Sequence, residues 1–108
     1  MDEKTVEKVG ETIRSIAEDE AIKIDELMIF GSRARNDYTE DSDVDVVLVS
    51  EDFRNVKWYE RGMKFQRDWD YGNLPDPEII CLTPEEFDER RKKLGDIVKR
   101  AVQEGIEI

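Results

Sequence analysis

Hydrophobic residues along the chain follow two spacings, and together these predict a mixture of helices and strands. In residues 3–20 they recur every three or four positions among charged residues, which is the spacing of an amphipathic helix. Residues 25–30, 44–50 and 78–83 are short apolar runs, two of them rich in branched side chains, and these predict strands. This order of elements predicts an α/β (α+β) fold, in which helices pack on one mixed β-sheet of three or more strands.

A further helix is predicted over residues 52–71, between the second and third strands. Its expected apolar face consists of Val56, Tyr59, Met63, Phe65 and Trp69. Residues 72–77 contain glycine, asparagine and two prolines, so they predict a turn that leads into the third strand.

The last helix is predicted to begin at Thr83 and to end near Gln103. Thr83 and Glu86 match the two ends of a capping box, and Pro84 suits the first helical position. Gly105 is placed to end this helix. The residues expected to face inward are Phe87, Leu94, Ile97, Val98, Ala101 and Val102.

Length and targeting signals bound the kind of protein. The 108 residues are enough for one hydrophobic core, and we expect a single domain over residues 1–108. The sequence shows neither a secretory leader nor an apolar run that approaches a membrane span, so we expect a cytoplasmic protein. Cys81 is the only cysteine, which excludes an internal disulfide and a cysteine metal cluster.

The charge balance narrows the function further. The formal net charge of −11 argues against a general nucleic-acid binder, because phosphate neutralisation needs a basic surface. The charge fits a site that recruits divalent cations, or a basic partner surface, and solubility alone explains it equally well. Because the sequence contains no histidine, carboxylates are the remaining candidates for acid–base or metal chemistry.

Two aspartates at the start of the second predicted strand are the main candidates. Asp43 and Asp45 are two positions apart, so in a strand they project from the same face, about 7 Å apart at their Cα atoms. Val47 and Val49 continue that face, which is therefore expected to be partly covered. Neighbouring carboxylates in such a place repel each other unless a cation holds them. The alternative is a pair of solvated acids at the entry to a strand.

Mg²⁺ is the cation that this pair favours. It takes hard oxygen ligands, commonly one or two carboxylates together with substrate phosphates. Two such ions that share carboxylates stabilise both oxygens of an in-line phosphoryl displacement. The pair therefore points to chemistry on a phosphate ester or anhydride.

The residues before this strand are suited to a phosphate. Gly31 follows the first strand and has no side chain, which lets a phosphate approach the backbone closely. Ser32 offers a hydroxyl donor, and Arg33 and Arg35 add positive charge, although structural ion pairs with nearby acids are an equal alternative for the two arginines. An anion-binding turn beside a metal dyad describes a nucleoside triphosphate site.

The pattern as a whole resembles a known family. The stretch GSRARNDYTEDSDVD combines Gly31-Ser32, ten intervening residues, and Asp43-Val44-Asp45. Together with the segments SDVDVVLVS, PEIICLT and TPEEF, it resembles the minimal nucleotidyltransferases of the DNA polymerase β-like superfamily over nearly the whole chain.

This resemblance implies a role for each candidate residue. Asp43 and Asp45 would bind metal ions, two Mg²⁺ in all, and a third carboxylate on the third strand would complete the set. Glu78 is our choice for that carboxylate and Asp76 is the alternative. The nucleotide-binding residues would be Gly31, Ser32, Arg33, Arg35 and Ser42. The third carboxylate of the family is commonly aspartate, so a glutamate there shifts the group that orients or deprotonates the attacking hydroxyl.

The resemblance also implies an activity and a partner. The expected reaction is metal-dependent transfer of a nucleoside monophosphate, AMP from ATP, to a hydroxyl group of a partner protein. In the minimal family the partner is a small all-helical protein of the HEPN class, and the nucleotidyltransferase acts as its antitoxin. One alternative is a module that neutralises this partner by binding alone. Another is transfer to a small hydroxylated molecule, for which this short chain would have to form a homo-oligomer.

Overall fold

The centre of the molecule is a mixed β-sheet, which confirms the predicted fold class. The computed structural model describes residues 3–30, 43–93 and 95–108. In these residues the sheet has four strands in the order β3-β2-β1-β4. Their bounds are β1 Glu26–Phe30, β2 Val44–Val49, β3 Pro77–Leu82 and β4 Ile106–Glu107. Strands β2 and β3 are parallel, whereas β1 is antiparallel to both β2 and β4.

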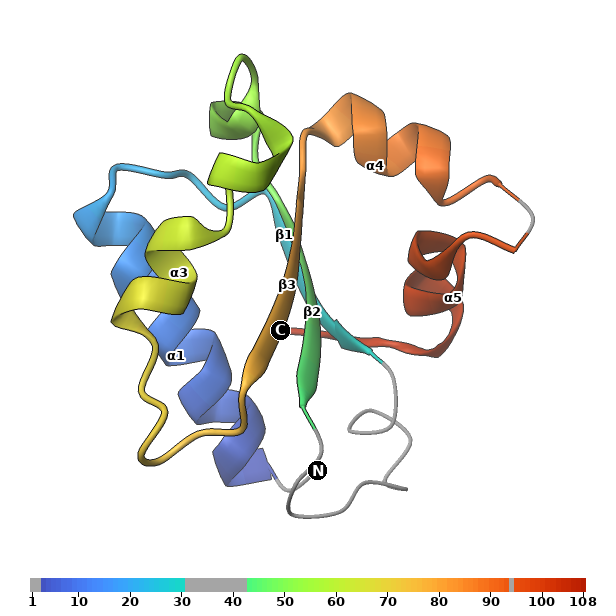
Figure 1. Cartoon of the computed structure of the whole chain (residues 1–108). Helices are drawn as coiled ribbons and strands as arrows, with labels where there is room; N and C mark the ends of the chain where they lie inside the picture. Colours follow the sequence, from blue (N-terminus) through green and yellow to red (C-terminus); the bar gives the residue numbers. More distant parts are fainter. Residues whose placement is uncertain (1–2, 31–42, 94) are drawn as a thin grey trace.

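Helices cover both faces of this sheet (Figure 1). The helix α1, Glu3–Asp19, and the short helix α3, Met63–Asp68, lie on one side, while α4, Pro84–Arg90, and α5, Ile97–Glu104, lie on the other. The alternation of side chains along β2 serves both layers. Val44, Val46 and Leu48 belong to the core under α1 and α3, and Val47 and Val49 belong to the core under α4 and α5.

The expected helix over residues 52–71 was wrong in extent. This segment instead contains two 3₁₀ turns, η1 Glu51–Phe53 and η2 Trp58–Glu60, followed by α3. Asn55 has a left-handed backbone with φ of 66°, and such a residue interrupts a right-handed helix. Of the predicted apolar face, Phe65 and Trp69 are buried and Val56 is half-buried, but Tyr59 and Met63 are exposed.

The expected helix from Thr83 to Gln103 begins as predicted but is two helices. The capping box is present, since the Thr83 hydroxyl accepts from the Glu86 backbone N–H and the Glu86 carboxylate accepts from the Thr83 backbone N–H. Gly95, with φ of +81°, then reverses the chain, and Asp96 caps α5 through the Val98 backbone N–H.

This break changes which residues face the core. Phe87, Val98 and Ala101 are buried as predicted, but Ile97 and Val102 are exposed, and Leu94 lies outside the described residues. The predicted stop is confirmed, since Gly105 is the C-cap of α5.

The close approach of the end of α5 to the backbone of β1 requires a glycine at position 105. A side chain there would lie 2.8 Å from the Ile29 carbonyl oxygen and would also meet the Ala101 carbonyl oxygen. The chain therefore turns tightly between α5 and β4, which pairs with β1 through Met28 and Ile29. Sequence patterns did not predict β4, because a strand of two residues carries no periodicity. None of the helices in the described part of the chain is long and apolar enough to cross a membrane.

Candidate active site

The carboxylates that the sequence singled out meet where β2 and β3 begin. Asp45 is paired with Phe30 of β1 on one side and with Glu78 of β3 on the other. Because β2 and β3 are parallel and in register, Asp45 and Glu78 project from the same face of the sheet. The residues that follow on that face, Val47 and Val49, are fully buried or nearly so, as predicted. The apolar core under α4 and α5 therefore ends at an acidic rim.

These carboxylates interact strongly with one another. Several causes together raise the pKa of Asp45 to about 6; burial is the largest, and the hydrogen bond that its carboxyl shares with the Glu78 carboxyl is the next. The negative charges of Glu78 and Asp43 act in the same direction. Asp43 is exposed at the strand entry, and Asp45 is half-buried. Three acidic side chains from two strands therefore share one electrostatic environment.

Glu78, not Asp76, is the carboxylate that the sheet register places against Asp45. Asp76 is exposed, and its backbone carbonyl accepts a hydrogen bond of 2.8 Å from the Val44 N–H, which continues the β2–β3 ladder by one step. This ladder fixes the start of β3 and thus the position of Glu78. Gly31, Ser32, Arg33, Arg35 and Ser42, the predicted nucleotide-binding residues, lie outside the described residues.

The chemistry of this donor set fits a divalent cation. Carboxylate oxygens are hard ligands, and a cation between Asp43 and Asp45 offsets the repulsion that raises the Asp45 pKa. The carboxyls of Asp45 and Glu78 are hydrogen-bonded to each other. Among the described residues, no three acidic side chains are arranged so that together they hold a metal ion. The carboxyl–carboxyl hydrogen bond has to open for both oxygens to face an ion.

A buried arginine, which the sequence patterns did not indicate, fixes the outer edge of β3. The Arg61 side chain is 8% exposed, and its guanidinium forms an ion pair of 2.6 Å with Glu86. It also donates to the carbonyl oxygens of Val56 and Cys81 at 3.1 and 3.2 Å. Arg61 thus ties the η1–η2 segment to β3 and to the start of α4. The only feature of the sequence that could have indicated this ion pair was Glu86. Its carboxylate accepts one hydrogen bond in the capping box and can accept another from a basic side chain.

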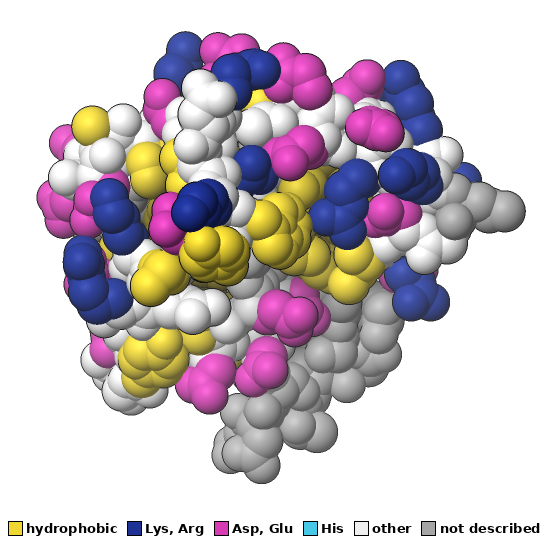
Figure 2. Space-filling view, turned by 45° about the horizontal axis from the view of Figure 1, so that its top comes forward, with side chains coloured by type: hydrophobic (Ala, Val, Ile, Leu, Met, Phe, Trp, Pro, Cys, Tyr) yellow, Lys and Arg dark blue, Asp and Glu magenta, His cyan; other side chains and the backbone are white. Residues whose placement is uncertain are grey.

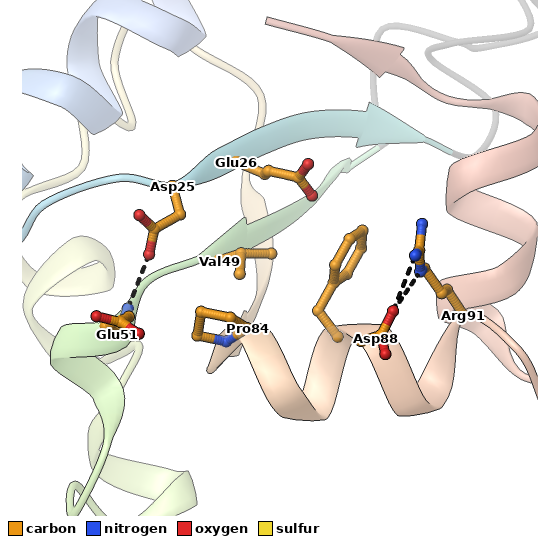
Figure 3. A pocket seen from close by; sticks show the side chains of 8 residues that line it. Asp25, Glu26, Val49, Glu51, Pro84, Asp88 and Arg91 are labelled. Carbon is orange, nitrogen blue, oxygen red and sulfur yellow. Dashed lines mark hydrogen bonds and ion pairs between the residues drawn. The ribbon is translucent and has the colours of Figure 1, made fainter.

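A separate pocket of about 420 Å³ lies at the opposite end of β2 (Figure 3). The lining residues are Asp25, Glu26, Val49, Glu51, Pro84, Phe87, Asp88 and Arg91. Two of its carboxylates already have partners within it. The Asp25 carboxylate accepts from the Glu51 N–H at 3.0 Å, and the Asp88 carboxylate accepts from Arg91 at 2.8 Å. This pocket is not the site that the sequence predicted.

The family of the chain follows from a comparison of its sequence with protein families. Residues 10–107 match the family described as nucleotidyltransferase domain. The chain belongs to the nucleotidyltransferase domain family. This membership supports transferase activity, and the family generally uses a nucleoside triphosphate and a divalent metal.

Two solved structures have the same fold. A candidate nucleotidyltransferase from Sulfolobus solfataricus has a TM-score of 0.64 and 22% identity over 96% of this chain and 78% of that chain. A toxin–antitoxin structure with AMP-PNP has a TM-score of 0.59 and 16% identity over 90% of this chain and 69% of that chain. Identities this low establish the nucleotidyltransferase fold alone. No curated protein matches the sequence.

Proposed function

We propose that this nucleotidyltransferase-domain protein transfers AMP from ATP to a hydroxyl group of a partner protein, as the cytoplasmic antitoxin of a HEPN-class toxin. The observation that carries the proposal is the in-register pair Asp45 and Glu78 beside Asp43, in a chain of the nucleotidyltransferase domain family. The toxin–antitoxin structure with AMP-PNP, which has the same fold, supports both the nucleotide and the protein partner.

In this proposal each carboxylate has a part in positioning the reactants. Asp43 and Asp45 hold Mg²⁺, which supplies positive charge against the triphosphate when it is bound. Glu78, next to them, accepts the proton of the attacking hydroxyl or orients that hydroxyl. The hydroxyl oxygen forms a bond to the α-phosphorus, the bond from that phosphorus to the bridging oxygen breaks, and pyrophosphate leaves.

The residues outside the described part of the chain complete the proposed site. Gly31 and Ser32 hold the triphosphate, Arg33 and Arg35 offset its negative charge, and Ser42 steadies the entry into β2. The apolar core that starts directly behind Asp45, with Val47 fully buried, keeps water from the inner side of the carboxylates. Exclusion of water on that side strengthens the electrostatic interactions in the site.

Label transfer tests this function directly. The protein is incubated with Mg²⁺, ATP labelled at the α-phosphate, and the HEPN-class protein encoded in the same genome. We expect label on the partner, and we expect Asp43→Asn to lower the transfer rate at least 100-fold. Glu89→Gln is the matched control, because it removes a carboxylate that is 73% exposed on α4, and its rate should equal that of the wild type. A wild type that binds ATP and its partner yet transfers no label contradicts the proposal.

A second candidate function is neutralisation of the partner by binding alone. The observation that favours it is the glutamate at position 78, whose carboxyl is bonded to Asp45 and does not stand free to meet a hydroxyl. In that case Asp43→Asn still protects cells from the toxin, whereas the transferase requires the aspartate for protection. Cell survival with the two forms of the protein separates the candidates.

A further inference from the structure

A buried tryptophan is hydrogen-bonded to the backbone of the turn that leads into β3. Trp69, the C-cap of α3, is 4% exposed, and its indole N–H donates to the Pro75 carbonyl oxygen at 2.9 Å. A buried tryptophan usually finds a partner for this N–H, so the bond by itself indicates only a well-formed core. Its place in the chain gives it a further consequence, because Pro75 comes three residues before Glu78.

The stretch that enters β3 has few backbone donors of its own. Pro75 and Pro77 have no backbone N–H, so Asp76 carries the one backbone donor of these three residues. Two of their carbonyl oxygens accept hydrogen bonds, that of Pro75 from the Trp69 indole and that of Asp76 from the Val44 N–H at 2.8 Å. The first bond connects the stretch to the core, and the second connects it to β2.

Side-chain packing does not hold the acidic residues at this end of β3. Asp76 and Glu78 are exposed, and Figure 2 shows acidic side chains at the surface beside hydrophobic ones. In the four-strand order β3 is an edge strand, with β2 as its one neighbour. Segments with few buried contacts open locally at little cost in free energy. Two side chains hold the backbone of this edge, Arg61 at the Cys81 carbonyl oxygen and Trp69 just before the strand begins.

We propose that Trp69 is a positioning residue for nucleotide transfer, because its bond to the Pro75 carbonyl oxygen holds the start of β3 where the Glu78 carboxyl stays beside Asp45. This inference rests on the proposed function, in which Glu78 orients or deprotonates the attacking hydroxyl. Trp69 belongs to the core under α1 and α3, on the other face of the sheet from the carboxylates, so it acts through Glu78. A misplacement of about 1 Å in a reacting group can cost about 100-fold in rate.

The first test separates kcat from KM. Trp69→Phe removes the N–H and keeps an aromatic ring in the core. With ATP labelled at the α-phosphate and the HEPN-class protein encoded in the same genome, we expect its kcat to fall at least 10-fold. The KM for ATP should stay within twofold, because the residues proposed to hold the metal ions and the triphosphate are unchanged.

Tyr71→Phe is the matched control for this variant. It removes another hydrogen bond from a side chain to the backbone close by, that from the Tyr71 hydroxyl to the Gln66 carbonyl oxygen at 2.6 Å. That bond does not touch the residues that enter β3, so kcat and KM should equal those of the wild type. If Trp69→Phe and Tyr71→Phe have the same kcat, the inference is refuted.

The Glu78→Gln background separates positioning from a general loss of structure. If Trp69 acts through Glu78, the two substitutions are coupled, and Trp69→Phe should lower the residual kcat of Glu78→Gln less than twofold. A loss of 10-fold in both backgrounds would mean that Trp69 supports the whole fold and would refute the positioning role.

Amide hydrogen exchange tests the same contact without turnover. In Trp69→Phe the Val44 amide, which donates to Asp76, should exchange at least 10-fold faster than in the wild type. The Ser50 amide, which donates to the Leu82 carbonyl oxygen at 2.9 Å at the other end of β2 and β3, should keep its rate. An unchanged rate at Val44, or equal acceleration at both amides, refutes the inference. If the wild type binds ATP and its partner yet transfers no label, the transferase proposal fails, and the exchange rates alone judge the contact.

An analogue of tryptophan with sulfur in place of the ring N–H covers the case in which Trp69→Phe does not fold. The chain has two tryptophans, so Trp58→Phe, at a side chain that is 55% exposed, leaves Trp69 as the one site of incorporation. The analogue keeps nearly the shape of tryptophan and lacks the donor. With the analogue, the Val44 amide should exchange at least 10-fold faster than in Trp58→Phe made with ordinary tryptophan, and equal rates refute the inference.

Discussion

Asp45 is expected to destabilise the folded protein at neutral pH, so Asp45→Asn should stabilise it. Burial, together with Glu78 and Asp43, raises the pKa of Asp45 from 3.8 to about 6 in the folded chain. Each pKa unit corresponds to about 1.4 kcal/mol, which sets an upper bound of about 3 kcal/mol for the cost of the charged form. Because Asp45 is half-buried and its charge is partly screened, we expect a gain of about 1–3 kcal/mol in the free energy of unfolding.

The pH dependence identifies the cause of this gain. A carboxyl with a raised pKa favours folding while it is protonated, so its contribution is complete below about pH 4 and is lost as the pH rises through 6. Wild type and Asp45→Asn should therefore be about equally stable near pH 4, and the variant should be more stable above pH 7. The measurement is urea unfolding at several pH values, followed by circular dichroism.

Two further variants serve as controls. Glu78→Gln removes the negative charge beside Asp45 but leaves the burial that is the largest cause of the raised pKa, so it should reproduce only part of the gain. Glu89→Gln removes an exposed carboxylate of α4 and should leave the difference between pH 4 and pH 7 unchanged. If Asp45→Asn lowers the free energy of unfolding at pH 7, or changes it equally at all pH values, then the charged Asp45 carboxylate does not destabilise the folded protein as argued.

Three other outcomes follow from the same structure. Arg61→Met should lower the free energy of unfolding by about 2–4 kcal/mol in urea denaturation, because Glu86 loses its ion pair and the carbonyl oxygens of Val56 and Cys81 lose their hydrogen-bond donor. A loss below about 0.5 kcal/mol would contradict this. Gly105→Ala should cost about 1–3 kcal/mol or more in thermal unfolding, since its methyl group would lie 2.8 Å from a carbonyl oxygen of β1; an unchanged Tm would exclude the tight turn. Mg²⁺ at 100 times its Kd should stabilise the wild type by about 2.7 kcal/mol and Asp45→Asn by much less, and equal stabilisation would place the ion elsewhere.

The first three strands and α1 were predictable because their patterns are continuous. Residues 3–20 contain one helical period without a break, and the structure has α1 over Glu3–Asp19. The three apolar runs became β1, β2 and β3 with their ends shifted by one residue at most. In each case burial of one face agrees with the local periodicity, so sequence and tertiary packing favour the same conformation.

The two long helices failed for a common reason. The predicted helices run through Asn55 and Gly95, yet both residues adopt a positive φ, which is incompatible with a continuous right-handed helix. Chain reversal at these points lets η2 reach the edge of β3 and lets α5 pack back on β1. Packing against strands that are distant in sequence therefore outweighed the local helical pattern, and it left Tyr59, Met63, Ile97 and Val102 exposed.

The sequence by itself determined which carboxylates were candidates and that Asp43 and Asp45 share a face, because alternation along a strand is a local property. Only the tertiary structure decided that Glu78 is the partner of Asp45, since this depends on the parallel register between two strands more than thirty residues apart in the chain. The raised pKa of Asp45 likewise arises from groups on two strands and from burial. The exposure of Trp58, Tyr59 and Met63 also had no local signal, because Arg61 and Gly62 pack their own segment against β3 and leave these side chains outside.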